Sequence, residues 1–421
     1  MMDRGRPAVL LTSAYYYGTL AAARCLGERG VPIVFADSVS LGPARWSRYV
    51  TRRELSPPDR PIERFIDWLL AFGKREPGHV LYATRDDNAW AFAQHEGVLK
   101  EHFRLVTPPF ATVARLLDKR SLYSACVDVG IRIPWTQFPR DPGELDELAK
   151  NTPFPVIIKP RTQVLFTLRK GVIASSAETL RCSYEEFVRS DRHDAAFLEN
   201  DPEVGHPMVQ EYCGAQPMYC MSGYCDPKRG LFVARAARKL VQWPRQAGVG
   251  ICFEDVPVNE ELANRVRRLC ERTGFFGVFE AEFVMKADAH LLVDFNPRFF
   301  GQMGFDSARD LPSPYLIYLA AIEDFGRLEQ EVQSARKWRA PGRMLFADRT
   351  ALMVSSIAER LVGRSASDPV LPKNGQSNST RVIDFSADER DWLPGFLDRT
   401  IQVERALRHG LAVLRTAARG T

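Results

Sequence analysis

The segment 279–298, FEAEFVMKADAHLLVDFNPR, constrains the fold of this chain more than any other stretch. Apolar and polar residues alternate in it on both sides of a short turn, and alternation with a period of two predicts β-strands. The segment is therefore predicted to form a β-hairpin. A three-residue loop at 287–289 would place Glu282 directly opposite Asp294.

Two carboxylates in such a position repel each other, because directly opposed side chains of a hairpin have Cβ atoms roughly 4.5–5.5 Å apart. A cation between them would remove that cost. Mg²⁺ suits the position, since it takes one or two carboxylates and completes its coordination with waters and substrate phosphates. On the same face Glu280 is predicted to lie opposite Asn296, and the planar fork of Arg298 suits phosphate or carboxylate.

An ordinary hairpin with one solvated face shows the same alternation, so the spacing alone leaves both interpretations open. The acids gather at one end of the polar face, however, and Asn-Pro-Arg stands at the exit of the second strand. This asymmetry favours a metal site. The candidate ligands are Glu282, Asp294 and Asn296, with Mg²⁺ as the expected metal and Mn²⁺ as an alternative.

Glu282 followed by Asp294, Asn296 and Arg298, in the form D-x-N-P-R, resembles the metal-binding end of the ATP-grasp superfamily. Members usually carry Glu-x-Asn-x-Arg, so that Asp294 is a departure towards a shorter carboxylate. The resemblance covers about half of the chain, residues 110–325. It implies an α/β (α+β) chain in which nucleotide lies between two α+β subdomains, preceded by a Rossmann-like domain.

Two lysines match the family positions that reach the nucleotide phosphates. Lys119 follows Asp118 within the helical pattern of residues 112–129, and Lys159 ends the apolar strand FPVIIK. A lysine at a strand end is a positioned point charge, which suits phosphate, although either lysine alone is an ordinary surface residue. The strand VQEYC resembles the segment along which adenine lies, and its candidate contacts are Gln210, Glu211, Tyr212 and Cys213.

A second pair of cations, Arg238 and Lys239, ends a predicted hairpin strand. With Arg298 they are the candidate catalytic residues, placed to contact the γ-phosphate or an acyl-phosphate; a surface charge cluster is an equal alternative for the pair. The loop TQVLFTLRKG departs from the family, since it has one glycine where many members have several. Arg169 and Lys170 are expected to contact phosphate there instead. The usual ribose carboxylate is not evident.

The opening of the chain alternates strand, helix and strand, which predicts a doubly wound N-terminal domain. Its strand 79–84 ends in Arg85-Asp86-Asp87. Acids at the carboxyl end of such a strand either face a ligand or cap the following helix. The predicted division is 1–110 (Rossmann-like), 111–207 (first ATP-grasp subdomain), 208–325 (second subdomain with the hairpin) and 326–421 (a mainly helical C-terminal extension).

Composition and net charge limit the classes of partner that this chain is expected to bind. The chain has 421 residues and a formal net charge of +5, which argues against a dedicated nucleic-acid surface. No apolar run approaches the ~18–20 residues that span a bilayer, and no signal peptide is recognised, so a cytoplasmic location is expected. The eight scattered cysteines indicate reduced thiols. The amphipathic helix expected over 400–417 is predicted to dock onto the body of the protein or onto a partner chain, with a membrane surface as the alternative. Whether the chain forms a homodimer is left open.

Taken together, the resemblance implies an ADP-forming ligase that uses Mg-ATP to activate a small-molecule carboxylate as an acyl-phosphate for attack by an amine or similar nucleophile. It is most similar to the carboxylate–amine ligases and carbamoyl-phosphate-synthase-like proteins. Two alternatives stay open: a bicarbonate-using carboxylase or carbamoyl-phosphate-type enzyme, and a non-catalytic ATP-binding module.

Overall fold

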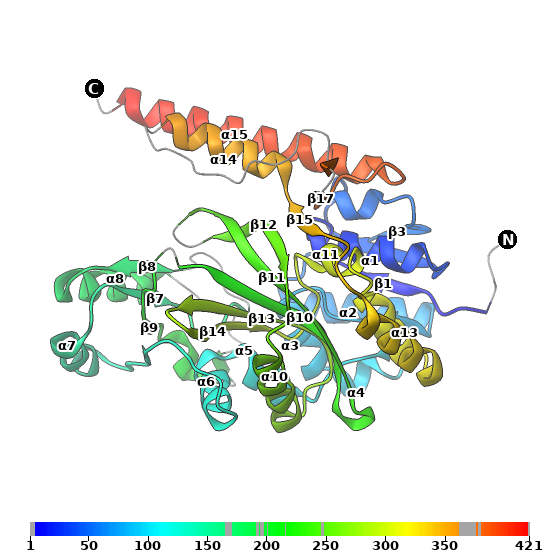
Figure 1. The fold of residues 1–421 in the computed structure, drawn as a ribbon, viewed down its shortest axis with the longest axis horizontal. Helices are drawn as coiled ribbons and strands as arrows, with labels where there is room; N and C mark the ends of the chain where they lie inside the picture. The colour runs from blue at the N-terminus through cyan, green and yellow to red at the C-terminus, as the bar shows by residue number, and fades with distance from the viewer. Residues whose placement is uncertain are drawn as a thin grey trace.

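The computed structural model describes residues 5–164, 171–190, 193, 198–199, 201–214, 216–245, 248–361, 376–377 and 380–419. Its strands form three sheets of five, four and eight strands, with helices packed around them. Figure 1 shows the N-terminal domain beside the large sheet and the small sheet at the opposite end.

The N-terminal sheet is parallel, with the strand order β3-β2-β1-β4-β5. Its central strands are short apolar runs buried on both faces, as a doubly wound sheet requires. The strands are β1 (Val9–Leu11), β2 (Ile33–Asp37), β3 (Arg52–Leu55), β4 (His79–Leu81) and β5 (Phe103–Leu105). The helices are α1 (Tyr17–Gly27), the 3-10 turn η1 (Pro43–Trp46), α2 (Ile62–Arg75), α3 (Asp86–Gln94) and α4 (Glu96–Leu99).

The small sheet is antiparallel, in the order β6-β9-β7-β8. Its strands are β6 (Thr136–Gln137), β7 (Val156–Lys159), β8 (Val172–Ala174) and β9 (Met208–Glu211), and the helices of this region are α5 (Phe110–Leu117), α6 (Lys119–Asp128), α7 (Pro142–Asn151) and α8 (Ala177–Ser190). Apolar residues of α7 and α8 pack on β7 and form one core with it. Because β9 pairs with β6 and β7, this sheet extends to Glu211, past the boundary expected at 207.

The large sheet has the order β14-β13-β10-β11-β12-β15-β17-β16. Its strands are β10 (Met218–Asp226), β11 (Leu231–Trp243), β12 (Val249–Val256), β13 (Gly277–Lys286), β14 (Ala289–Asn296), β15 (Arg343–Ala347), β16 (Gln376–Ser377) and β17 (Thr380–Asp384). The helices of this half are α10 (Glu260–Thr273), α11 (Met303–Ser307), α12 (Ser313–Ala321), α13 (Phe325–Lys337), α14 (Arg349–Leu361) and α15 (Trp392–Arg419). The segment after 326 is mainly helical, yet three of its strands continue the sheet that carries the hairpin.

The hairpin β13–β14 has the predicted register at its acidic end, but the predicted three-residue loop is wrong. Lys286 pairs with Ala289, which leaves a two-residue loop. Further along, Glu282 pairs with Asp294 while Phe283 pairs with Leu292, so β14 carries one extra residue there. This β-bulge shifts the register by one and restores the facing carboxylates.

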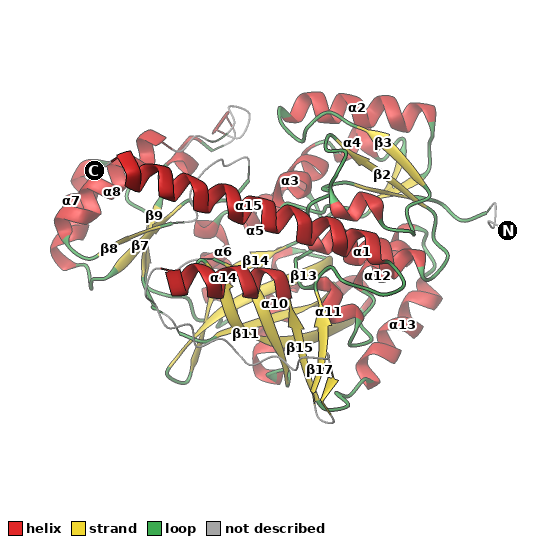
Figure 2. Cartoon of the chain, turned by 90° about the horizontal axis from the view of Figure 1, so that it is seen from above, coloured by secondary structure: helices red, strands yellow, loops and turns green. Residues whose placement is uncertain are grey.

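The C-terminal helix α15 is fastened to the N-terminal domain by buried acids. Asp391 accepts hydrogen bonds from Arg24 Nε at 2.9 Å and from Ser47 Oγ at 2.8 Å. About two helical turns later, Asp398 meets Tyr17 and Asp348, whose carboxylate accepts from the Tyr17 hydroxyl at 2.8 Å. Figure 2 shows α15 crossing the molecule above the N-terminal domain and the large sheet.

The carboxylates of Asp348 and Asp398 share their hydrogen-bond donors. The Tyr17 hydroxyl and the Gln402 amide each donate to both of them. Burial raises the pKa of Asp398 to about 6, with Asp348 adding to the effect and Ser386 opposing it. The same burial raises the pKa of Asp348, which Asp384 also faces. The folded state therefore binds a proton more tightly than the unfolded chain does, and stability falls as the pH rises from about 4 to about 6.

Asp398→Asn is expected to stabilise the chain by about 1–3 kcal/mol at pH 8, because asparagine is neutral and its amide can donate to Asp348. The gain should shrink towards zero on acidification below the raised pKa, where the wild-type carboxyl is already protonated. Urea unfolding at several pH values measures this. A gain that is the same at every pH would show that the buried charge is not its cause.

Candidate active site

The facing carboxylates of the hairpin each hold a lysine from another element. Lys239 of β11 contacts Glu282, with 2.7 Å between Nζ and Oε2. Lys119, the first residue of α6, donates to Asp294 Oδ1. The repulsion expected between the two opposed acids is thus offset by one cation for each. Lys119 and Lys239, both named from the sequence, lie at the hairpin.

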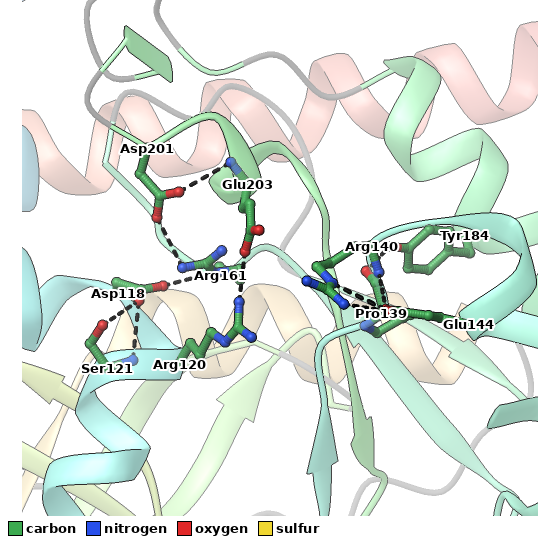
Figure 3. Close-up of polar contacts among 10 residues, drawn as sticks. All are labelled: Asp118, Arg120, Ser121, Pro139, Arg140, Glu144, Arg161, Tyr184, Asp201 and Glu203. Carbon is green, nitrogen blue, oxygen red and sulfur yellow. Dashed lines mark hydrogen bonds and ion pairs between the residues drawn. The ribbon is translucent and has the colours of Figure 1, made fainter.

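Lys119 and Lys159 are brought together by their neighbours in the chain. Asp118 caps α6 by accepting from Ser121, and it also accepts from Arg161 Nε at 2.9 Å (Figure 3). The backbone N–H of Lys119 donates to the carbonyl of Arg161 at 2.9 Å. Although burial opposes it, the Arg161 guanidinium lowers the pKa of Asp118. This buried ion pair ties the start of α6 to the end of β7.

Lys159 is half-buried at the end of β7. Burial lowers its pKa, and the charge of Lys119 lowers it further, while Asp294 and Glu282 act in the opposite direction. Its Nζ donates to Gln210 Oε1 at 3.2 Å. An anion placed between Lys119 and Lys159 would therefore relieve their mutual repulsion.

The predicted adenine segment lies on β9 and just beyond it. Gln210 is buried, and its amide donates to Tyr123 and Thr136, so its side chain serves the protein interior and Lys159. Glu211 pairs with Lys286 near the hairpin loop. That pair and Lys119–Asp294 join the small sheet region to the large sheet at two points. Tyr212 and Cys213 follow β9, where the N–H of Tyr212 donates to the carbonyl of Pro155 at 3.2 Å.

Arg298 is held by the N-terminal domain. Nε and Nη2 donate to the two oxygens of Asp86 at 2.8 and 3.2 Å, and Nη1 donates to the Tyr16 hydroxyl at 2.8 Å. The remaining donors reach Asn296 Oδ1 and the carbonyl of Phe299, both at 2.8 Å. All five N–H groups of the guanidinium have protein acceptors, so a substrate anion would have to displace one of them.

The contact between Arg298 and Asp86 decides between the two roles left open for the acids after β4. Helix α3 begins at Asp86 with Arg85 at its N-cap position and no side-chain cap, so the capping interpretation is wrong. Asp86 faces the candidate site and lines a small cavity there with Lys119, Asp294 and Asn296. Asp87 instead pairs with Arg60 at 2.9 Å. Sequence reasoning missed Tyr16 altogether, since no local pattern links it to a residue so far along the chain.

A buried acid, Glu280, completes the polar face. Asn296 Nδ2 donates to Glu280 Oε2 at 3.0 Å, and Gln302 Nε2 donates to Oε1. Burial, and then the charge of Glu282, raises the pKa of Glu280 to about 8. Hydrogen bonds thus run without a break from Asp86 through Arg298 and Asn296 to this carboxyl group. The sequence signal for Glu280 was its position two residues before Glu282, on the same face of the hairpin.

Arg238 does not belong to the site, which corrects the expectation for this residue. Side chains alternate along β11, so Arg238 points to the opposite face of the sheet from Lys239. There it pairs with Glu254 at 2.5 Å, and Arg343 pairs with the same carboxylate at 2.7 Å. Arg169 and Lys170, expected to contact phosphate, lie outside the described residues.

Comparison with known proteins identifies the fold of this chain. The sequence matches no family model and no curated protein. Solved structures do resemble it. The biotin carboxylase domain of 2-oxoglutarate carboxylase from Hydrogenobacter thermophilus superposes with a TM-score of 0.57 at 13% identity, over 74% of this chain and 69% of that one. The chain has the ATP-grasp fold.

Two further ATP-grasp structures extend the likeness. N5-carboxyaminoimidazole synthetase from Staphylococcus aureus gives a TM-score of 0.55 at 12% identity, covering 74% of this chain and 77% of its own. L-amino acid ligase from Bacillus licheniformis gives 0.54 at 13% identity, covering 76% and 75%. The predicted fold class is confirmed. At identities this low the likeness shows the fold alone.

The donor set fits magnesium that arrives with a nucleotide. In the part of the chain that the structure describes, no group of three or more His, Cys, Asp or Glu side chains could hold a metal ion by itself. Glu282 and Asp294 supply two carboxylates, the number with which Mg²⁺ is usually bound when phosphates complete its shell. The side-chain oxygen of Asn296 already accepts from Arg298, so it is the weaker candidate ligand.

Proposed function

We propose that this protein is an ATP-dependent ligase that activates a small-molecule carboxylate as an acyl-phosphate and passes it to an amine or similar nucleophile, with release of ADP. The observation that carries the proposal is the pair Glu282 and Asp294, each bridged to a lysine from another element, with Lys159 close enough to respond to both acids. A bound Mg-triphosphate requires cations beside its phosphate oxygens and carboxylates beside its magnesium ion, and these residues supply both.

The residues divide the work by charge. Lys119 and Lys159 would leave their present partners for phosphate oxygens, and Lys239 would turn from Glu282 towards the transferred phosphoryl group. Glu282 and Asp294 would hold Mg²⁺, which supplies charge neutralisation at the phosphate oxygens. Gln210 and Glu211 would position the base end of ATP together with the backbone of Tyr212 and Cys213.

Arg298 has a different part in this proposal from a free anion clamp. Because its donors are all engaged, it would hold Asn296 and the hairpin in register with the N-terminal domain. It would contact the acyl-phosphate with one N–H after Asp86 or Tyr16 releases it.

The chemistry takes two steps. A carboxylate oxygen bonds to the γ-phosphorus while the bond from that phosphorus to the β,γ-bridging oxygen breaks, which gives ADP and the acyl-phosphate. The amine nitrogen then bonds to the acyl carbon, phosphate leaves with the C–O electron pair, and the amine proton passes to solvent.

The neighbours' recorded ligands support the nucleotide. The Hydrogenobacter structure is a complex with MgADP, ADP and bicarbonate, and the Bacillus neighbour is an amino acid ligase.

No helix in the described residues is long and apolar enough to cross a membrane. We place the reaction in the cytoplasm, where ATP is available.

The test is ADP release by the full chain with Mg-ATP and pools of carboxylates and amines. We expect ADP to form only when a carboxylate is present, and a condensation product one water lighter than the sum of its parts when an amine is added. ADP release that needs bicarbonate instead would identify a carboxylase or carbamoyl-phosphate-type enzyme. Nucleotide binding without turnover in any pool would identify a non-catalytic module.

A further inference from the structure

The two acids that face each other across the hairpin are already paired with lysines of their own chain. Lys239 Nζ lies 2.7 Å from Glu282 Oε2, and Lys119 donates to Asp294 Oδ1. Only 7% of the Lys239 side chain and 12% of the Lys119 side chain are exposed, so solvent and salt screen these ion pairs weakly. The carboxylate oxygens that a metal ion would bind are thus held by ammonium groups.

The backbone of both lysines is fixed beside the hairpin. Lys239 stands inside the large sheet between Met218 of β10 and Phe253 of β12, and its Nζ contacts the Met218 sulfur at 3.6 Å. Lys119 begins α6, where its backbone N–H donates to the carbonyl of Arg161 at 2.9 Å. An ammonium group that lost its acid would therefore stay in the site. A buried charge deprived of its partner is strongly destabilising.

A divalent cation without a nucleotide would meet two obstacles here. It would add two positive charges to a place where three ammonium groups lie together, since the charges of Lys119, Asp294 and Glu282 all act on Lys159. It would also separate each acid from its lysine and leave both lysines without an anion. A triphosphate removes both obstacles, because its oxygens accept from the released lysines and its negative charge exceeds the positive charge of the metal.

We propose that Lys119 and Lys239 are internal counter-ions that exclude free divalent cations from the site, so that the nucleotide and its metal bind only together. This inference rests on the proposed function, because that function assigns Glu282 and Asp294 to the metal. Such coupling is reciprocal, so the metal strengthens nucleotide binding by the same factor as the nucleotide strengthens metal binding. After turnover the lysines return to the acids, which promotes release of the metal together with ADP.

The experiment measures Mn²⁺ binding to the nucleotide-free full chain by electron paramagnetic resonance, which distinguishes free from bound Mn²⁺. We expect weak binding by the wild type. The dissociation constant should be at least about tenfold lower in Lys119→Met and in Lys239→Met, since each substitution leaves one acid without its cation. The two variants are independent tests, because Lys239 lies inside the large sheet while Lys119 faces an acid whose side chain is 35% exposed. Circular dichroism verifies the fold of each.

Lys286→Met is the matched control. It removes one positive charge from the same hairpin, but Lys286 pairs with Glu211 and with neither acid of the site. Its Mn²⁺ binding should equal that of the wild type. A second control combines Lys239→Met with Asp294→Asn. This double variant should lose the gained Mn²⁺ binding, because one carboxylate of the facing pair is then missing.

Three results would overturn the proposal. One is a nucleotide-free wild type that binds Mn²⁺ as tightly as the two lysine variants do. Another is binding that stays equally weak in Lys119→Met and Lys239→Met. The third is an equal gain in Lys286→Met, which would assign the effect to net charge. Absence of ADP formation with every carboxylate would contradict the proposed function instead, and the gain of Mn²⁺ by the two lysine variants would still support this inference.

Discussion

Replacement of Asp294 by Asn should reduce magnesium-dependent ADP formation by at least about a hundredfold, the scale on which loss of one charge-stabilising group slows catalysis. Asparagine keeps the shape of the side chain and its bond to Lys119, but it removes one of the two carboxylates available to the metal. The rate of ADP release at saturating Mg-ATP measures the effect. The unfolding midpoint should stay close to that of the wild type.

Asp288→Asn is the matched control, since Asp288 lies exposed in the loop of the same hairpin and faces no lysine of the site. It should retain full activity. Unchanged ADP production by Asp294→Asn would remove the metal assignment, and an equal loss in both variants would point to a general disturbance of the hairpin.

The largest effect on stability is expected at Arg309, whose side chain is completely buried. Its guanidinium pairs with Asp306 at 2.5 Å and with Asp255 at 2.7 Å, and it also donates to the carbonyl of Ala236. Arg309→Met should lower the free energy of unfolding by about 3–5 kcal/mol, because it leaves a buried carboxylate without a cation. Urea unfolding at neutral pH measures the loss.

A second substitution tests the cause. Burial raises the pKa of Asp306, and Arg309 opposes that shift. Asp306→Asn removes the stranded charge, so the double variant should recover a large part of the loss. Arg327→Met is the surface control, since Arg327 is exposed and its pair with half-buried Glu331 should contribute no more than about 1 kcal/mol. No recovery in the double variant would assign the loss to packing.

The hairpin shows what a local pattern can predict. The alternation of 279–298 was enough to predict that Glu282 and Asp294 face each other. The predicted loop length was wrong, but the bulge in β14 compensates for the difference of one residue. The apolar runs of the N-terminal half likewise predicted a doubly wound sheet. In both cases the information lies within neighbouring residues, where strand periodicity decides the direction of each side chain.

Residues distant in the chain were beyond such reasoning. The sequence could name Arg298 but not its partners Asp86 and Tyr16, which come from the N-terminal domain. It could name Arg238 and Lys239 as a pair, but only the pairing of β11 with its neighbours decided that they face opposite sides of the sheet. The C-terminal strands could not be assigned to the large sheet for the same reason.

The fold class, the facing acids and the two lysines that precede them could be predicted from the order of residues alone, since each depends on periodicity or on spacing along one element. The pairing of each acid with its cation, the full engagement of Arg298 and the contact of Asp398 with Tyr17 became known only from the folded chain. Those features arise from packing between elements far apart in the chain, and no local preference specifies such packing.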